Sequence, residues 1–346
     1  TVEALVTADG YTNQAVKVQL LWEDAEGKLA AVDTRQLQLT GGKRQYPVSL
    51  THTPVEPGEY KVSVSVAPAE GELVTTNNSQ STFVTVTKGG INVLYLVGAQ
   101  RIGGGPGIEP RFVRSALASY PDLHVRYELI NYRRQQLDLR EQLQEGKFDV
   151  FLLGNLDYAG LNRDTWEMLA DEVGRGAGFA MLGGFHSFGP GGFRNTAIDD
   201  LLPIVLGQAE RQNFGEAPRL DMHLPGPLAL KPVALGNKPH PIFQAEDSDS
   251  PQPDWTKLQP LDGANRFDRA GLKPNAAIIA EASDPQRTPL LVTGAWGSGH
   301  TAAVAFDTTW RWQMEGMGEL QHRFWRQLVM WLAQKDELDG KSVWGR

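Results

Sequence analysis

The stretch GAGFAMLGGFHSFGPGGF, residues 176–193, decides how the larger part of this chain folds. It contains an apolar run of strand length, Phe179 to Leu182, which leads directly into Gly183 and Gly184. Glycines at this place let the backbone turn sharply or approach another group closely, so we predict an elbow at the end of a buried strand. In open α/β sheets the carboxyl ends of such strands line the crevice where ligands bind.

The predicted elbow carries no obvious nucleophile. The chain contains no cysteine, and the nearest hydroxyl group belongs to Ser187. A strained Gly-x-Ser-x-Gly turn places a glycine two residues before its serine. Phe185 occupies that position here, so the sequence does not match that motif.

Length and composition indicate an ordinary globular protein of more than one domain. The chain has 346 residues, of which 41% are hydrophobic and 21% are charged, and one core seldom extends over so long a chain. The net charge of -8 argues against a nucleic-acid partner, because phosphate recognition needs a concentrated basic surface. No apolar segment approaches the length of a membrane helix. The chain begins at Thr1 without a methionine, so we expect it to be a piece of a longer protein.

The first part of the chain, residues 1–88, has the pattern of an all-β domain. Alternating apolar and polar residues recur in short runs that turn residues separate, namely 16–20, 36–39, 46–50, 60–66 and 82–86. Short strands at this spacing predict an antiparallel sandwich of immunoglobulin type.

The second part, residues 89–346, alternates predicted strands with predicted helices. The run 91–97 is almost continuously apolar, as in a strand buried on both faces of a parallel sheet. Further strands are predicted at 123–129, 148–153, 179–182, 289–293 and 302–306, and helices near 112–120, 137–143, 162–173, 196–201 and 319–334. Residues 207–282 are rich in proline and aspartate and have only short apolar runs, so we predict irregular structure with minor strands there. This order predicts a doubly wound, mostly parallel α/β sheet.

Five segments in order resemble a known superfamily. They are Met181–Gly192, Leu201–Pro203, His240–Ile242, Asp307–Trp312 and His322–Leu328. With them, residues 91–334 resemble the class I glutamine amidotransferase-like superfamily. More narrowly, they resemble a branch found at the C-terminal part of large, membrane-anchored bacterial proteins that often also carry a von Willebrand factor A domain. The resemblance implies a flavodoxin-like fold and an extracytoplasmic, periplasmic location in a membrane-tethered parent protein.

The residues that give this superfamily its chemistry are missing. Active members of the superfamily hydrolyse glutamine with a cysteine at the elbow and a His-x-Glu pair after a later strand. Here the elbow falls on Gly183 or Gly184, and Asp307-Thr308-Thr309-Trp310 follows the later strand. Loss of the nucleophile removes nearly all of the rate advantage of such a unit. We therefore predict that the chain has no glutaminase activity.

Two groups of residues remain candidates for catalysis. His186 and Ser187 follow the elbow, where a general base and a hydroxyl could serve a hydrolase, and Asp307 follows a later strand end. Adjacent side chains point apart in an extended chain, so His186 and Ser187 need a special turn to act together. The structural alternative is that both form hydrogen bonds within the glycine-rich loop.

Other residues are candidates for binding a ligand at the crevice. Gln100 and Arg101 follow the first strand of the sheet, and Gly183 and Gly184 form the elbow. The segment from Gly103 to Gly107 could present backbone amides to an anion, although Pro106 removes one donor, or it could be a flexible insertion. Indole faces beside Asp307 could hold a sugar or a peptide, or could pack against the last helix; the two indoles belong to Trp310 and Trp312.

No metal site and no cofactor site are predicted. The seven histidines form no i, i+4 helical pair and no His-Glu-x-x-His motif. Asp247, Asp249 and Asp254 lack the glycine and the distal glutamate of a calcium loop.

The sequence thus favours a non-catalytic binding or assembly module that has a protein or a glycan as its partner. The alternative is a hydrolase, or a glycan- or peptide-processing enzyme, with a rearranged site near His186, Ser187 and Asp307. These two hypotheses differ in whether those three side chains converge in one cleft.

Overall fold

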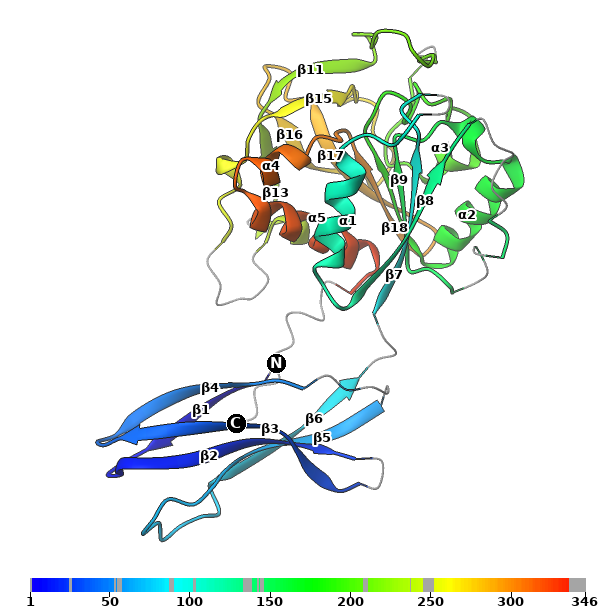
Figure 1. The fold of residues 1–346 in the computed structure, drawn as a ribbon. Coiled ribbons are helices and arrows are strands. Elements are labelled where there is room, and N and C mark those ends of the chain that lie inside the picture. Colours follow the sequence, from blue (N-terminus) through cyan, green and yellow to red (C-terminus); the bar gives the residue numbers. More distant parts are fainter. Residues whose placement is uncertain are drawn as a thin grey trace. The chain divides into compact units, whose positions relative to one another are not determined.

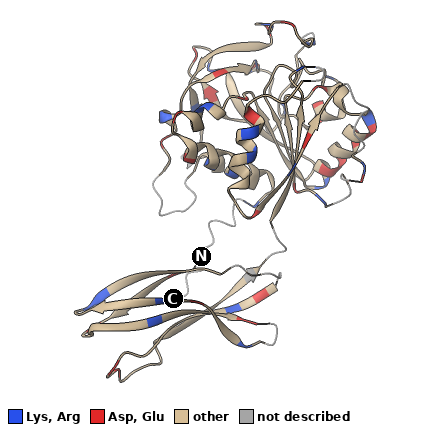
Figure 2. Cartoon of the chain, in the orientation of Figure 1, with Lys and Arg blue, Asp and Glu red and all other residues tan. Residues whose placement is uncertain are grey.

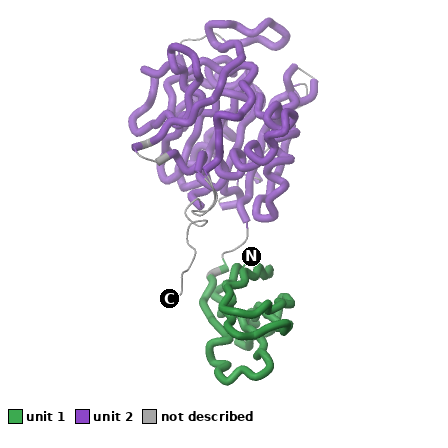
Figure 3. The backbone as a smooth tube through the Cα atoms, turned by 90° about the vertical axis from the view of Figure 1, so that its left-hand side faces the viewer, with its two compact units in different colours: residues 1–89, 343–346 green, residues 90–342 purple. Residues whose placement is uncertain are grey.

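The computed structural model describes residues 2–24, 27–52, 54, 58–86, 90–101, 104–132, 139–141, 143, 146–207, 211–236, 238–244 and 252–335. The chain divides into two compact units, one within residues 1–89 and one within residues 90–342 (Figure 3). Each unit has a hydrophobic core of its own.

The first unit consists of antiparallel sheets. Strands β1 (Val2–Ala8) and β4 (Arg44–Leu50) form a pair, and a four-stranded sheet has the order β3-β2-β5-β6. Its strands are β2 (Thr12–Glu23), β3 (Leu29–Thr40), β5 (Gly58–Val66) and β6 (Ser79–Val86). Valines and leucines from β2, β4 and β5 meet in one buried cluster, so the two sheets pack against each other. The predicted runs of alternating residues all lie in these strands, and β1 is an additional strand.

The second unit is built on an eight-stranded mixed sheet with the order β12-β16-β17-β18-β10-β9-β7-β8 (Figure 1). Five strands are mutually parallel: β7 (Ile91–Gly98), β8 (Leu123–Ile130), β9 (Val150–Gly154), β10 (Gly178–Leu182) and β18 (Gly299–Val304). Three antiparallel strands extend it: β17 (Pro289–Trp296), β16 (Ala277–Ala282) and β12 (Leu230–Pro232). The sheet is therefore mixed, because the hairpin of β17 and β18 reverses the chain direction.

Helices cover both faces of this sheet (Figure 1). Helices α1 (Glu109–Ala118), α4 (Trp310–Met314) and α5 (Gly318–Leu332) pack together, and α2 (Arg163–Arg175) packs with α3 (Ala197–Leu201) across the sheet. Charged residues of both signs lie along α1 and α2 (Figure 2). Of the predicted helix at 137–143, residues 139–141 and 143 are described and form turns rather than a helix, while the other three lie outside the described residues; α4 was not predicted.

The segment between α3 and β16 contains more regular structure than its composition suggests. Strands β11 (His223–Leu228) and β15 (Leu261–Asn265) pair with each other, as do β13 (Ala234–Leu235) and β14 (Lys238–Pro239). Single 3₁₀ turns lie at Pro241–Phe243 and Trp255–Lys257, and another lies at Tyr158–Gly160. The pairing of β11 with β15 positions Asn265 beside the elbow.

Aromatic packing fixes the end of the elbow stretch to α2. Trp166 is completely buried, and its ring stacks on Tyr158 at 5.7 Å between centroids. The edge of Phe193, at the end of the elbow stretch, meets the same indole at 5.4 Å. The Trp166 indole N–H donates to the Tyr158 carbonyl oxygen at 2.9 Å, so this tryptophan satisfies its one polar group.

The start of α2 provides a test of the helix-capping rules. Asn162 precedes the helix in an extended conformation, and its side-chain oxygen accepts a hydrogen bond from the Thr165 backbone N–H at 2.8 Å. We expect Asn162→Ala to lower the free energy of unfolding of the second unit by about 1 kcal/mol, since it removes this acceptor. Chemical denaturation of the full chain measures the loss, and Asn162→Asp, which keeps an acceptor, is the control. Equal losses in both variants would contradict the capping role.

Candidate functional site

The elbow forms where predicted, but neither glycine has room for a side chain. The Gly183 N–H donates to the Phe306 carbonyl oxygen at 3.2 Å. A Cβ atom on Gly183 would lie 2.4 Å from the Ala305 carbonyl oxygen, and one on Gly184 would lie 2.5 Å from Asn155 Oδ1. Gly184 also has a φ of +139°, which side chains rarely adopt. The space into which a nucleophile would project is thus already filled.

Two asparagines bond the backbone around the elbow. Asn265 is buried, and its side chain accepts from the Gly184 N–H at 2.9 Å and donates to the Gly184 carbonyl at 3.0 Å. Asn155, directly after β9 with a φ of +41°, accepts from the His186 N–H at 2.9 Å. Backbone N–H groups at such a turn are the donors that an oxyanion hole uses. Here asparagine side chains occupy two of these donors.

His186 and Ser187 are buried and do not pair with each other. Their side chains are 3% and 1% exposed, and His186 Nδ1 and Ser187 Oγ have no hydrogen-bond partner among the described residues. The His186 ring stacks on Phe214 at 3.9 Å. Burial lowers the pKa of His186 to about 4, so its imidazole is neutral at pH 7. The two side chains therefore do not form a base and nucleophile pair.

Asp307 forms no hydrogen bond with His186 or Ser187 in the described part of the chain, and it acts electrostatically on a buried acid that the sequence did not reveal. Glu109, at the start of α1, accepts hydrogen bonds from the Thr309 backbone N–H at 3.0 Å, the Trp310 backbone N–H at 2.8 Å and the Thr309 hydroxyl. Burial raises the pKa of Glu109 to about 7, although these bonds oppose the shift and Asp307 adds to it. Burial likewise raises the pKa of Asp307 to about 6, and the Asp262 charge contributes.

Tyr95 on β7 completes this acidic group. The ring is 1% exposed, and its hydroxyl lies over Gly154, where an added Cβ would come within 2.9 Å of it. Burial raises the pKa of Tyr95, and the charges of Glu109 and Asp307 act in the same direction. Tyr95, Glu109 and Asp307 therefore influence one another electrostatically near the carboxyl ends of the parallel strands. Acids with perturbed pKa values at such a place are candidates for ligand contact.

The two tryptophans have different surroundings. Trp312 is completely buried, packs against Phe324 at 5.7 Å and donates from its indole N–H to the Gln259 carbonyl at 2.9 Å. Its indole face is therefore not available to a ligand. Trp310 is half-buried, and its backbone N–H is the group that Glu109 accepts from.

Gln100 and Arg101 lie at the end of β7 with exposed side chains. The Gln100 N–H donates to the Gly105 carbonyl at 3.0 Å, and the Gly104 N–H donates to the Arg101 carbonyl at 2.8 Å. Gly103 lies outside the described residues. No hydrogen bond among the described residues joins Gln100 or Arg101 to the elbow.

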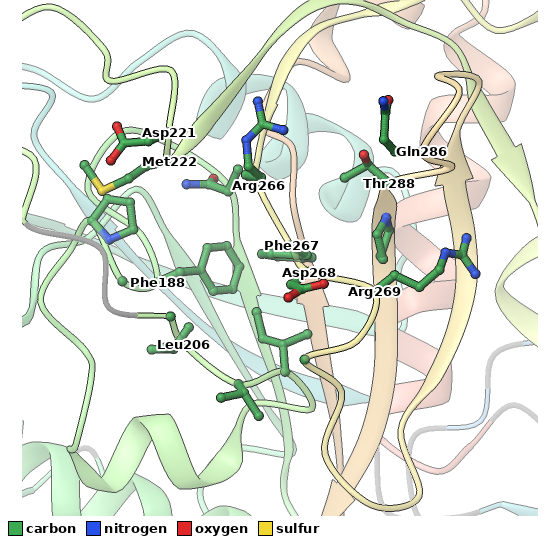
Figure 4. A pocket seen from close by; sticks show the side chains of 18 residues that line it. Phe188, Leu206, Asp221, Met222, Arg266, Phe267, Asp268, Arg269, Gln286 and Thr288 are labelled. Atoms are coloured by element: carbon green, nitrogen blue, oxygen red, sulfur yellow. The ribbon is translucent and has the colours of Figure 1, made fainter.

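A separate cavity of about 720 Å³ lies beside the elbow loop (Figure 4). Its walls come from residues 188–190, 204–207 and 265–269, with Asp221, Met222, Gly271, Gln286, Thr288 and Pro289. Asn265 lines this cavity and also bonds the elbow. Across the described residues, no group of three or more histidine, aspartate or glutamate side chains is arranged to hold a metal ion.

Sequence reasoning missed Asn155, Asn265, Glu109 and Tyr95. Asn155 directly follows the apolar run 150–154 and so stands at a strand end, a position that could have been noticed. Asn265 follows a short strand within a segment without clear periodicity, and Glu109 sits in the first turn of a helix, where acids are common. Only their contacts in three dimensions distinguish them.

A largely parallel sheet with a glycine elbow at its carboxyl edge defines an amidotransferase-like domain. The family model described as "Putative glutamine amidotransferase" (GATase1_like) matches residues 148–334, more than half of the chain. The chain belongs to this glutamine amidotransferase-like family.

Solved structures share the fold at low sequence identity. A cytoplasmic protein from Salmonella typhimurium LT2 is 19% identical over 70% of this chain and 99% of that one, with a TM-score of 0.53. A second cytoplasmic protein from Salmonella typhimurium is 14% identical over 69% and 98%, with a TM-score of 0.50. A ThuA-like protein from Parabacteroides merdae is 14% identical over 70% and 90%, with a TM-score of 0.45. No curated protein matches the chain.

None of the helices in the described part of the chain combines the length and the apolar character needed to span a bilayer.

The acidic group makes stability depend on pH in a defined direction. The folded pKa values of about 6 for Asp307 and about 7 for Glu109 lie above the ordinary values of 3.8 and 4.5. Protonation of these two carboxyl groups therefore favours the folded state. Their contribution to the free energy of unfolding is complete below about pH 4, and it is lost as the pH rises through about 6 for Asp307 and about 7 for Glu109. We expect Asp307→Asn to raise the free energy of unfolding at pH 8 by about 1–2 kcal/mol and to change it little at pH 4.

Chemical denaturation at both pH values measures this difference. Asp171→Asn, on the exposed side of α2, is the matched control because its carboxylate is in water. A loss of stability in Asp307→Asn at pH 8 would show that the carboxylate is stabilised in the fold by a partner.

Proposed function

We propose that this chain is a non-catalytic binding or assembly module, in which an amidotransferase-like scaffold has been kept and its catalytic elbow closed. The observation that carries the proposal is the pair of hydrogen bonds from Asn265 to both backbone groups of Gly184, at 2.9 and 3.0 Å. These bonds occupy the amide that would stabilise an oxyanion, and Asn155 occupies the space of a nucleophile.

The competing hydrolase hypothesis requires His186, Ser187 and Asp307 to converge. No hydrogen bond joins any two of these three side chains, all of which lie in the described part of the chain, and the burial of Ser187 keeps its hydroxyl from a substrate. Asp307 is electrostatically linked to Glu109, Tyr95 and Asp262 rather than to His186. A general base cannot catalyse hydrolysis without a nucleophile that it can reach. The arrangement of these residues therefore supports binding rather than hydrolysis.

We further propose that the module works outside the cytoplasm as part of a larger, membrane-tethered bacterial protein, with an immunoglobulin-like sandwich as its first unit. Two sheets packed on one cluster of valines and leucines support the sandwich. The resemblance of the segments at 181–192, 307–312 and 322–328 to such proteins supports the tether and the location. The net charge of -8 argues against a nucleic-acid partner, so the partner that we expect is a protein or a glycan.

The first test of this proposal is chemical. Purified chain incubated with L-glutamine is expected to release ammonia at the rate of a buffer blank, because the elbow lacks a nucleophile and asparagine side chains occupy the amide donors of Gly184 and His186. Hydrolysis of p-nitrophenyl acetate is expected to be the same for the native chain and for Ser187→Ala. Ammonia release above the blank would overturn the proposal, and a loss of esterase rate in Ser187→Ala would favour the hydrolase alternative.

A second test concerns the closed elbow itself. We expect Gly184→Cys to lower the free energy of unfolding by more than about 2 kcal/mol and to produce no glutaminase, since the new side chain meets Asn155 at a strained φ. Adding Asn155→Gly should recover part of this loss, because it removes the obstructing side chain at a residue that already has a positive φ. Full stability in Gly184→Cys alone would show that the elbow is open.

A further inference from the structure

The cavity beside the elbow loop has the size and the lining of a small-molecule site. Its volume of about 720 Å³ falls within the usual range for ligand pockets, about 300–1,000 Å³. Its floor is apolar and buried, and consists of Phe188, Ile204, Leu206, Met222 and Phe267. The Phe188 and Phe267 rings meet edge to face at 4.9 Å, which leaves a rigid aromatic surface.

Phe188 is held at this floor in an unusual conformation. Its φ of +58° is uncommon for a bulky residue, and its N–H donates to the Met181 sulfur at 3.2 Å. A hydrogen bond from the Phe193 N–H to the Phe188 carbonyl, 3.2 Å long, closes the loop behind it. Strained backbone of this kind occurs at ligand sites, because the surrounding structure must stabilise it.

The cavity also has two opposite charges without ion-pair partners. Arg266 donates from one guanidinium nitrogen to the Leu220 carbonyl at 3.2 Å, and Asp268 accepts from the Ala270 N–H at 2.9 Å. Both side chains are exposed, and neither makes an ion pair within the described part of the chain, although the Arg266 charge helps to lower the pKa of Asp284. Figure 4 shows the Phe188 ring and the Asp268 carboxylate turned toward the middle of the cavity, with Arg266 above them in that view.

The other two charged residues at the cavity are already paired. Arg269 bonds Glu281 and the Arg287 carbonyl, and Asp221 receives two hydrogen bonds from Arg219, at 3.1 and 2.8 Å. Among the charged residues that line the cavity, Arg266 and Asp268 are therefore the two that form no ion pair in the described part of the chain.

We propose that this cavity binds an apolar ligand that carries both a carboxylate and an ammonium group, the chemistry of a short apolar peptide with free termini. Arg266 binds the carboxylate, Asp268 binds the ammonium group, and the apolar side chains lie on Phe188 and Phe267. A ligand with only one charge leaves the other protein charge without a partner, so both termini contribute to affinity. The inference rests on the proposed function as a binding module and names the class of its ligand.

Calorimetric titration of the full chain with the dipeptide Phe-Leu tests this assignment. For a ligand of this size the expected Kd is on the order of 10–100 µM. The C-terminal amide of Phe-Leu, which lacks the carboxylate, and its N-acetyl derivative, which lacks the ammonium group, are each expected to bind about tenfold more weakly.

Two variants assign each terminus to one protein group. Arg266→Gln should bind the dipeptide about tenfold more weakly and should no longer distinguish it from the amide. Asp268→Asn should show the same loss but fail to distinguish the dipeptide from the N-acetyl derivative. Arg111→Gln and Asp171→Asn, exposed on α1 and α2, are the matched controls and should bind as the native chain does.

A further variant tests the cavity without touching its charges. Val205 is 55% exposed and lines the cavity, so Val205→Trp is expected to fold and to reduce binding at least tenfold by filling the space. Absence of saturable heat up to 1 mM dipeptide, or equal binding of all three ligands by native and variant chains, would overturn the inference. Ammonia release from glutamine and ester hydrolysis are measured separately, and only those results bear on whether the module is non-catalytic.

Discussion

The arrangement of the second unit depends on how Gly184 is held. Asn265 bonds its N–H and its carbonyl, and Asn155 fills the space where its side chain would stand. A buried backbone turn without such partners would leave unsatisfied polar groups, each costing about 1–3 kcal/mol. The same contacts that stabilise the turn remove the donor and the space that catalysis requires, so stability and loss of chemistry have one cause.

This constraint connects three parts of the chain that are distant in sequence. Asn155 comes from the end of β9, Gly184 from the end of β10 and Asn265 from the end of β15. The Asn265 backbone N–H donates to the Ala305 carbonyl at 2.7 Å, so β15 is also fixed to the end of β18. The elbow, the acidic group after β18 and the cavity beside residues 188–190 therefore share one rigid framework.

The acidic group has a structural role and a cost. Glu109 bonds the backbone of Thr309 and Trp310 and so ties α1 to the start of α4. The burial that makes these bonds strong also raises the pKa of Glu109 and Asp307, because a buried carboxylate loses its hydration. Within the described part of the chain, Asp307 has no comparable set of hydrogen-bond donors, so its raised pKa is not offset by hydrogen bonds from other residues as that of Glu109 is.

The sequence by itself determined the central strands of the sheet, most of its helices and the missing chemistry. Apolar runs such as 91–97 and 179–182 identified β7 and β10, because strands buried on both faces need continuous apolar residues. Asn162 and Thr196 indicated where α2 and α3 begin, and the absence of cysteine excluded a thiolate nucleophile. These features are local or compositional, so no tertiary information was needed.

Only the tertiary structure decided what lies around the elbow. The grouping of Tyr95, Glu109 and Asp307 and the bonds from Asn155 and Asn265 join residues that are far apart in sequence, and no periodicity encodes them. The sequence left open whether Trp312 packs or binds, and whether His186 and Ser187 act together. Burial and side-chain direction answered both questions, because they depend on which strands become neighbours in the sheet rather than on the order of residues along the chain.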